Sequence, residues 1–450
     1  MADSVQTPSK RVCHSNVEEE RGLEDIDRIS DLPDSVLCHV LSFLPTKMSV
    51  ATSVLSKRWI DLWTIVPALS FSYTEFTDRF VDPVYKVLAM FQAQTIHQFS
   101  LDFIPIATVD DAHIDKWISA AIKCSVQELS LKLNFCSPRG PLVRLHGHVF
   151  ASKTLVCLKL FGGVFVGVPA NVCLSSLRIL QLERVWYAND GSFNRLLSNC
   201  PILEDLIVER AWYDNILALD INVPSLKRIN VKSASSGADA CKLLINAPLL
   251  ERIELSDTMI WNVQVEDLSN LVEAIIDMEG TRELIKEMGN VKFLSLSEDA
   301  FSSIYYDSTK LPAFCNLVCL EITTRCEDWH YLAALLKYSD NLKALVFHII
   351  VPLYHLGRKC DMSLPETVQK RVSVSLQTLK LTGFCDQDCN WKLVRYVLKN
   401  AGLLKQMKIG TSLRLQKRGR RLKNLLMYPR ASMACEIVFF NDSSGQEYHL

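Results

Sequence analysis

Apolar residues recur along most of this chain in one six-residue phrase, with leucine or a similar residue at its first, fourth and sixth positions. The segment LRILQL, residues 177–182, is a clear copy. Successive side chains of a β-strand point to opposite faces, so the fourth and sixth positions share one face of a strand. The phrase therefore predicts a strand with one apolar face and one polar face.

The phrase returns at a regular interval, and many copies follow a turn such as NCPILEDL or NAPLLERI. Thirteen copies have an average spacing of about 26 residues, within the range of roughly 20 to 29 that is typical of leucine-rich repeats. A unit of this size cannot bury its own apolar side, so neighbouring units stack into a solenoid with a parallel sheet on one face. The expected fold class is α/β. The copies start at Ile96, Val126, Leu155, Leu177, Leu203, Leu226, Leu250, Leu271, Val291, Leu317, Leu342, Leu376 and Leu404, and residues 66–71 are a further candidate.

The polar positions of these strands are expected to line the concave face of the solenoid. Their charge changes sign along the chain, from acidic near residues 183–209 to basic near 228–252 and back to acidic at Glu273. This alternation suits a protein partner of mixed charge better than a polyanion. For any single position, a solvated polar face with no dedicated ligand stays open as the alternative. The candidate partner-binding residues are Glu183, Asp205, Glu209, Arg228, Lys232, Arg252 and Glu254.

A different pattern occupies residues 31–63, near the N-terminus. Apolar residues spaced at i, i+3, i+4 and i+7 predict a helix that starts at Pro33 and stops before Pro45, and two shorter helices follow, near residues 47–53 and from Ser56 to Trp63. Three helices of this length carry more apolar surface than they can hide from one another. A partner is therefore expected to cover the remainder.

The segment LPDSVLCHVLSFLPTKMSVATSVLSKRWIDLW, residues 32–63, resembles the F-box of plant F-box proteins. The resemblance implies docking on a Skp-type adaptor, which joins the F-box to a cullin-RING ubiquitin ligase. An N-terminal helical cap on the solenoid is the alternative, although a cap needs apolar residues on one side only. By position in the motif, the adaptor-facing residues would be Leu32, Pro33, Leu37, Val40, Leu44, Val54, Leu55 and Trp59.

The C-terminal part of the chain resembles a second module. The segments SLQTLKLTGFCDQDCNWKLVRYVLKNAGLLKQMKI and RLKNLLMYPRASMACEIVF are similar to the FBD module that ends many plant F-box proteins. That module has no assigned chemistry, but a last unit can shield the apolar end of the stack. The expected organisation is a disordered tail at 1–25, an F-box at 26–72, leucine-rich repeats at 73–373 and an FBD module at 374–440.

Composition narrows the function. The chain has 450 residues with 49 basic and 50 acidic side chains, so it lacks the basic excess typical of nucleic-acid binding. The polar first 25 residues contain no signal peptide, which indicates an intracellular protein with reduced cysteines. The F-box resemblance implies the nucleus and/or the cytoplasm. The longest apolar window, residues 345–353, is about half of what a membrane span needs. We expect no membrane segment.

No motif in the sequence predicts catalysis, a metal or a cofactor. GGVFVG at 162–167 lacks the Gly-Lys of a phosphate loop, and CDQDC at 385–389 and HGH at 146–148 stand without a second ligand pair. KRGRRLK at 417–423 is either a nuclear-import or phosphate-binding patch or a solvated loop.

With the F-box resemblance, these features favour a substrate-recognition subunit of a Skp-cullin-F-box ubiquitin ligase. Its solenoid would bind a protein substrate, and it would carry no catalytic residues of its own. Two alternatives stay open: a repeat scaffold with a degenerate F-box, and a receptor whose solenoid also binds a small ligand.

Overall fold

The computed structural model describes most of the chain between Ile29 and Tyr448. The described residues are 29, 31–76, 80–104, 109–133, 143–210, 216–233, 241–256, 260–303, 311–325, 332, 335–350, 374–384, 388–411, 425, 427–442, 444–445 and 447–448. Four features of the sequence fall outside them: the tail at 1–25, the insertion at 352–373, Cys385 of the CDQDC segment, and the basic run at 417–423.

Short helices form the N-terminal end. They are α1 (Asp34–Leu41), α2 (Thr46–Ala51) and α3 (Trp59–Leu62), with single 3₁₀ turns at Thr52–Val54 and Trp63–Ile65. Pro33 and Pro45 immediately precede α1 and α2, where their fixed φ suits a helix start. The third helix begins at Trp59 and not at Ser56 as the sequence suggested, because Ser56 contributes only its backbone carbonyl, which accepts from the Trp59 N–H.

A single sheet of sixteen strands runs through the rest of the molecule, and all neighbours are parallel except the last pair. Each of the thirteen predicted copies begins two residues before one of its strands, and residues 66–71 supply the first strand. The strands, in sheet order, are β1 (Ala68–Ser72), β2 (Gln98–Phe103), β3 (Glu128–Leu133), β5 (Cys157–Gly162), β7 (Ile179–Glu183), β9 (Asp205–Arg210), β11 (Arg228–Ser233), β13 (Arg252–Ser256), β15 (Glu273–Asp277), β16 (Phe293–Leu296), β17 (Cys319–Arg325), β18 (Ala344–Ile350), β19 (Thr378–Phe384), β20 (Gln406–Thr411), β21 (Glu436–Asn441) and β22 (Glu447–Tyr448).

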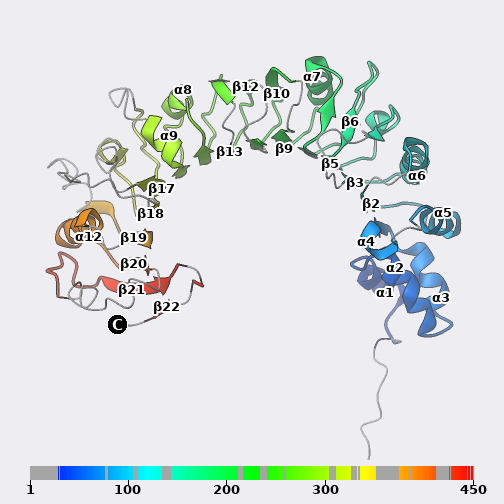
Figure 1. The fold of residues 1–450 in the computed structure, drawn as a ribbon, viewed down its shortest axis with the longest axis horizontal. Coiled ribbons are helices and arrows are strands. Elements are labelled where there is room, and N and C mark those ends of the chain that lie inside the picture. The colour runs from blue at the N-terminus through cyan, green and yellow to red at the C-terminus, as the bar shows by residue number, and fades with distance from the viewer. Residues whose placement is uncertain are drawn as a thin grey trace, which may run out of the picture.

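The sheet bends into an arc, with its strands on the inner side and the remaining elements outside (Figure 1). Two three-stranded parallel sheets stand on the outer side (Figure 1). They consist of β4 (Val143–Arg144), β6 (Val164–Val166) and β8 (Trp186–Tyr187), and of β10 (Ala218–Asn222), β12 (Cys241–Asn246) and β14 (Ile260–Val265). The outer helices are α4 (Tyr73–Phe76), α5 (Val81–Met90), α6 (Asp111–Lys123), α7 (Asp190–Ser198), α8 (Arg282–Lys286), α9 (Glu298–Ser303) and α12 (Asp388–Asn400), with a 3₁₀ turn at Val149–Ala151.

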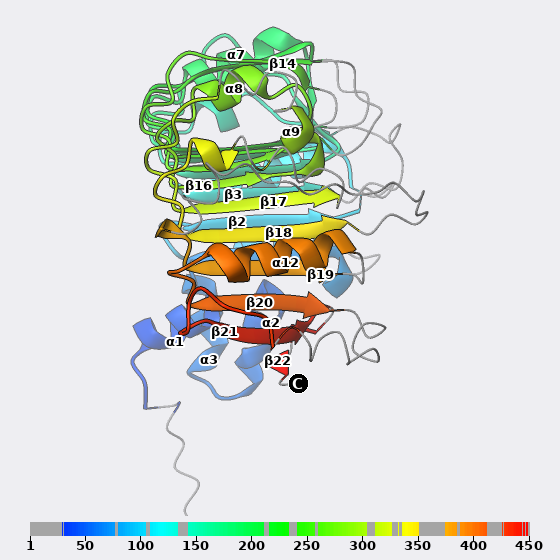
Figure 2. The ribbon, with the colours of Figure 1, turned by 90° about the vertical axis from the view of Figure 1, so that its left-hand side faces the viewer.

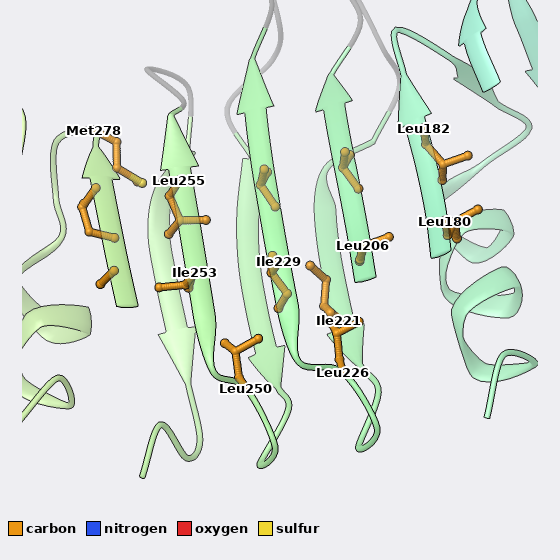
Figure 3. Packing of buried hydrophobic residues seen from close by; sticks show 14 of the residues in the cluster. Leu180, Leu182, Leu206, Ile221, Leu226, Ile229, Leu250, Ile253, Leu255 and Met278 are labelled. Atoms are coloured by element: carbon orange, nitrogen blue, oxygen red, sulfur yellow. The ribbon is translucent and has the colours of Figure 1, made fainter. Parts of the chain in front are cut away.

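The leucines of the repeated phrase fill the space between the inner sheet and the outer elements (Figure 3). Leu180 of β7 pairs in register with Leu206 of β9, which pairs with Ile229 of β11. These side chains are fully or almost fully buried in one continuous core. Because each core position contacts the same position of the next repeat, stability is distributed along the stack.

A second regularity follows one edge of the sheet. The residue just before the first leucine of a repeat is often polar, and its side chain donates a hydrogen bond to a backbone carbonyl of the preceding repeat. Asn270 donates to Pro248 O at 2.7 Å, Asn290 to Ser269 O at 3.0 Å, and Asn341 to Cys315 O at 2.6 Å. These bonds satisfy turn carbonyls and join each repeat to its neighbour.

Replacing Asn270 by alanine is expected to lower the local stability of β13 and β15 by about 1 kcal/mol, the usual net contribution of one such hydrogen bond. Leu249 occupies the equivalent position one repeat earlier and is exposed, so Leu249→Ala should change stability by less than about 0.5 kcal/mol. Native-state hydrogen exchange of the β13 and β15 amides measures both effects. Equal protection in the two variants would contradict a linking role for Asn270.

The N-terminal helices are joined to the sheet without a spacer. Thr46 Oγ1 of α2 accepts from the Ser70 N–H of β1 at 2.8 Å, and the Gln92 N–H donates to Thr64 O at 2.9 Å. Trp63 belongs to the core of the solenoid. The helices and the first strand therefore form one packed unit.

The residues expected to form the FBD module continue the same sheet. They supply β19, α12, β20 and β21, with α12 lying across the outer side of these strands (Figure 2). Trp391 of α12 packs edge-on against Phe384 with ring centroids 5.0 Å apart. Antiparallel β22 then covers part of the free edge of β21.

Candidate interaction surfaces

Exposed apolar side chains are concentrated on the N-terminal helices. Residues 29–65 hold ten of the exposed large hydrophobic residues, against twelve in all the other described residues. Such a concentration on a folded surface marks a site of interaction. The ten are Ile29, Val36, Val40, Phe43, Leu44, Met48, Val54, Leu55, Ile60 and Ile65.

Five of the eight residues that the sequence predicted to face an adaptor lie on this exposed surface, and a sixth, Leu32, is half-buried against the small core beneath. Val54 is the most accessible of them, at 88% exposure. The five exposed residues are Pro33, Val40, Leu44, Val54 and Leu55.

The structure places the other two residues, Leu37 and Trp59, elsewhere. Leu37 is 1% exposed and Trp59 5% exposed, within a small core that they form with Cys38, Leu41 and Leu62. Their side chains cannot reach a partner while the helices are folded. They hold α1 against α3, so their expected role as direct contacts is corrected to a structural one.

Six of the ten exposed residues were not among the predicted adaptor-facing residues, namely Ile29, Val36, Phe43, Met48, Ile60 and Ile65. The apolar spacing of α1 predicts a single face, but the structure divides these residues into two rows. Leu37 and Leu41 point inward, whereas Val36 and Val40 are exposed. The sequence contains a signal for this second row, because the apolar stripe of α1 is wider than a helix needs when it buries one side only.

Among the described residues, six of the seven candidate residues on the concave face form an ion pair with a residue of a neighbouring repeat, and the exception is Glu183. Arg228 binds Asp205 through Nη2 and Oδ2 at 2.6 Å, and this bond is the main cause that raises the pKa of Arg228. Lys232 Nζ lies 2.8 Å from Glu254 Oε1, and Arg252 Nη1 lies 2.5 Å from Glu273 Oε1.

The other two acidic candidates are also occupied. Glu209 binds the Arg184 Nε at 2.6 Å, and Glu183 accepts from the Gln181 amide. The alternating bands of charge expected from the sequence are therefore linked across neighbouring strands and largely neutralise one another.

The histidines of the HGH segment do not stand alone, as the sequence had suggested. His146 Nδ1 and His148 Nδ1 lie 3.0 and 3.5 Å from Asp115 Oδ1 of α6. Within the described ranges, however, no group of histidine, cysteine and acidic side chains has the arrangement of a metal site.

A chain of carboxylate, imidazole and hydroxyl groups crosses β17, β18 and β19. His348 Nε2 lies 2.6 Å from Glu321 Oε1, and His348 Nδ1 lies 2.7 Å from Thr382 Oγ1. The hydroxyl also lies 3.3 Å from Phe347 O, and the adjacent Gly383 N–H donates to Asp442. Because that backbone donor is already engaged, the group fits a link between strands better than an acyl-transfer site.

The sequence predicts that GGVFVG forms a turn, but only Gly163 separates β5 from β6, and Val164–Val166 of the segment form β6. None of the helices in the described part of the chain combines the length and apolarity needed to cross a bilayer.

Comparison with known proteins identifies both parts of the molecule. Residues 87–434 match a family model described as "At1g61320/AtMIF1, LRR domain", and residues 29–70 match the F-box domain. F-box/FBD/LRR-repeat protein At4g26340 of Arabidopsis thaliana is 31% identical over 430 residues, which cover 92% of this chain and 100% of that protein. FBD-associated F-box protein At4g10400 of the same plant is 31% identical, again with 92% and 100% covered.

The helical N-terminus, the arc of repeats and these matches define an F-box protein with a leucine-rich-repeat solenoid, the general architecture of a substrate adaptor. The resemblance found in the sequence is confirmed. The chain belongs to the F-box/FBD/LRR-repeat family.

Proposed function

We propose that the protein is the substrate-recognition subunit of a Skp-cullin-F-box ubiquitin ligase. The observation that carries the proposal is the apolar surface on the F-box helices, which stays exposed although these helices have a closed core of their own. Covering such a surface with a partner removes apolar area from water and stabilises a complex. A Skp-type adaptor is the partner that an F-box implies.

The solenoid takes the second role in this proposal. Its concave face carries polar side chains along the inner sheet, which is packed directly against the F-box helices, and this face would receive the protein substrate. The protein contributes proximity and no bond-making step, since holding a substrate beside a ubiquitin-conjugating enzyme raises the effective concentration of its lysines. The nucleus and the cytoplasm are the compartments in which we place this activity.

The proposal predicts that Val54→Asp weakens the binding of a purified Skp-type adaptor at least tenfold while the thermal unfolding of the protein stays unchanged. A carboxylate at this exposed position costs nothing in the free protein. In the complex it would be buried with no positive charge to pair with. Titration of the adaptor by calorimetry measures the loss.

Met427→Asp is the matched control, because Met427 is equally exposed at the other end of the solenoid. Its affinity for the adaptor should equal that of the wild type. If the folded wild-type protein binds no Skp-type adaptor, the ligase role is wrong and a repeat scaffold with a degenerate F-box takes its place.

A further inference from the structure

Two arginines stand side by side in the middle of the concave face. Arg228 of β11 and Arg252 of β13 are direct register partners, so their side chains leave the sheet at adjacent positions. Like charges placed directly opposite each other on neighbouring strands destabilise a sheet. The fold nevertheless accommodates the pair, because an acidic residue lies on each side of it.

The acidic neighbours are Asp205 and Glu273, the outer register partners of the two arginines. The row across four strands is therefore acid, arginine, arginine, acid. Arg228 is 52% exposed over an Asp205 that is 17% exposed, and Arg252 is 39% exposed beside a Glu273 that is 32% exposed. The arginine is the more exposed member of each pair, most clearly for Arg228, so a partner meets the N–H donors of both arginines together with the partly exposed carboxylate of Glu273.

The arginines keep donors beyond those that the acids engage. A guanidinium group has five N–H donors, and one carboxylate accepts two of them in a bidentate pair. Asp205 and Glu273 hold the two arginines from their outer sides. Glu254, two residues along β13, has its Oε2 3.8 Å from Arg252 Nη2, so both guanidinium groups are held in place. Two oriented guanidinium groups at adjacent strand positions have the geometry to hold one further carboxylate between them.

The next row of the same face offers an acceptor. Asn230, two residues along β11 from Arg228, has a buried Oδ1 that accepts no hydrogen bond from any described residue. A buried acceptor of this kind is stabilised by a donor such as a peptide N–H. Donors for a carboxylate beside an acceptor for an amide favour a peptide over a free inorganic anion.

The surroundings limit how much negative charge this position can take. Glu183 and Glu209 are neighbours in register on the strands before it, and Asp277 lies on the strand after it. Beside the central row, Lys232 and Glu254 pair with each other, so the row and this pair are both formally neutral. The remaining charges at the margins are acidic, so a single carboxylate fits, whereas a polyanion or a phosphate dianion is repelled. Basic residues on either side of that carboxylate would meet the acidic margins.

From this arrangement we infer that Arg228 and Arg252 form the anchor of the substrate site, and that they bind one aspartate or glutamate side chain of a substrate segment that carries basic residues on both flanks. The inference rests on the proposed function, because it takes the concave face as the substrate surface. It names the class of segment recognised, which is an extended peptide with an acidic centre and basic flanks.

A displayed library of random 12-residue peptides tests the inference, with the full-length protein in its adaptor complex as bait. We expect enrichment of one aspartate or glutamate with lysine or arginine on either side. The enriched peptides are then titrated by fluorescence anisotropy against Arg252→Gln/Glu273→Gln and Arg228→Gln/Asp205→Asn. Each double variant removes one cation and one anion, so the net charge of the protein is unchanged while the anchor is lost, and affinity should fall at least tenfold.

The matched control is Arg178→Gln/Glu204→Gln. This pair is an ion pair of the same kind and similar exposure, but both residues lie just before their strands, at the edge of the sheet. Its peptide affinity should stay within twofold of the wild type.

Three results would overturn the inference: enrichment of peptides without an acidic residue, equal affinity in the anchor variants, and tighter binding when the acidic residue is replaced by phosphoserine. The last would make the surface a phosphopeptide site. Adaptor binding of the same variants is measured in parallel. If the wild-type protein binds no adaptor, the proposed function is wrong. If it binds the adaptor but shows no preference for these peptides, only this inference is wrong.

Discussion

Trp59→Ala is expected to lower the stability of the F-box helices by about 3 to 5 kcal/mol, the usual result of emptying a large buried aromatic site. Trp59 is one of six residues in the core between α1 and α3, and a module of this size has little stability to lose. We therefore expect the helices to unfold locally while the solenoid stays folded. Trypsin cleavage after Lys57 or Arg58 measures the effect. These residues lie in an exposed turn, but a protease needs several extended residues on both sides of the cleaved bond, so fast cleavage there reports opening of the flanking helices.

The neighbouring variant Ile60→Ala separates the two kinds of F-box residue. Ile60 is exposed on the apolar surface, so its loss should leave trypsin resistance within about 0.5 kcal/mol of the wild type and should weaken adaptor binding. If Trp59→Ala keeps full resistance to trypsin and loses only adaptor binding, Trp59 is a contact residue after all, as its place in the sequence motif implied.

Gly162→Ala is expected to destabilise the β3–β5 region by about 3 kcal/mol or more. Gly162 ends β5 with φ at +75°, and a Cβ on it would lie 1.9 Å from Leu133 O. The backbone of β3 has to move to admit the methyl group, which breaks the parallel pairing of the two strands. Hydrogen exchange of the β3 and β5 amides reports the loss, together with the yield of soluble protein.

Gly445→Ala isolates the backbone contribution to that result. Gly445 has a similar φ of +68°, but a Cβ there meets no atom within 4 Å. The substitution should cost only about 1 kcal/mol, the penalty of a left-handed conformation for an alanine. Equal losses in the two variants would show that the close approach to Leu133 has no effect.

The inner sheet was predictable from the sequence because one physical requirement repeats. Every unit has to place leucines at the same positions of its strand, so Leu180, Leu206 and Ile229 all carry the same pattern. The outer strands were not predictable in this way. Segments such as Ala218–Asn222 have only five residues, and a run of this length does not separate a strand from a loop or a helix turn.

The candidate sites were predicted in part, for a similar reason. The position of Arg228 on the concave face followed from alternation along its strand. Its contact with Asp205 and its alignment with Arg252 depend on the register between strands that are more than twenty residues apart. Along the chain, the charged residues form separate acidic and basic segments. Across the sheet, residues of opposite charge from neighbouring strands form pairs. The division of the α1 stripe into buried and exposed halves likewise depends on where α3 packs.

The absence of a spacer between the F-box helices and β1 turns the solenoid into a molecular ruler. Neighbouring strands are about 4.8 Å apart, so each repeat added or removed between β1 and β11 would move the arginine pair by that distance along the arc and change no contact at either end. Arg228 lies six strand spacings from β1, which corresponds to about 29 Å along the sheet. In a rigid assembly of this kind, repeat number sets how far the bound segment lies from the F-box, and therefore which lysines of a substrate come within reach.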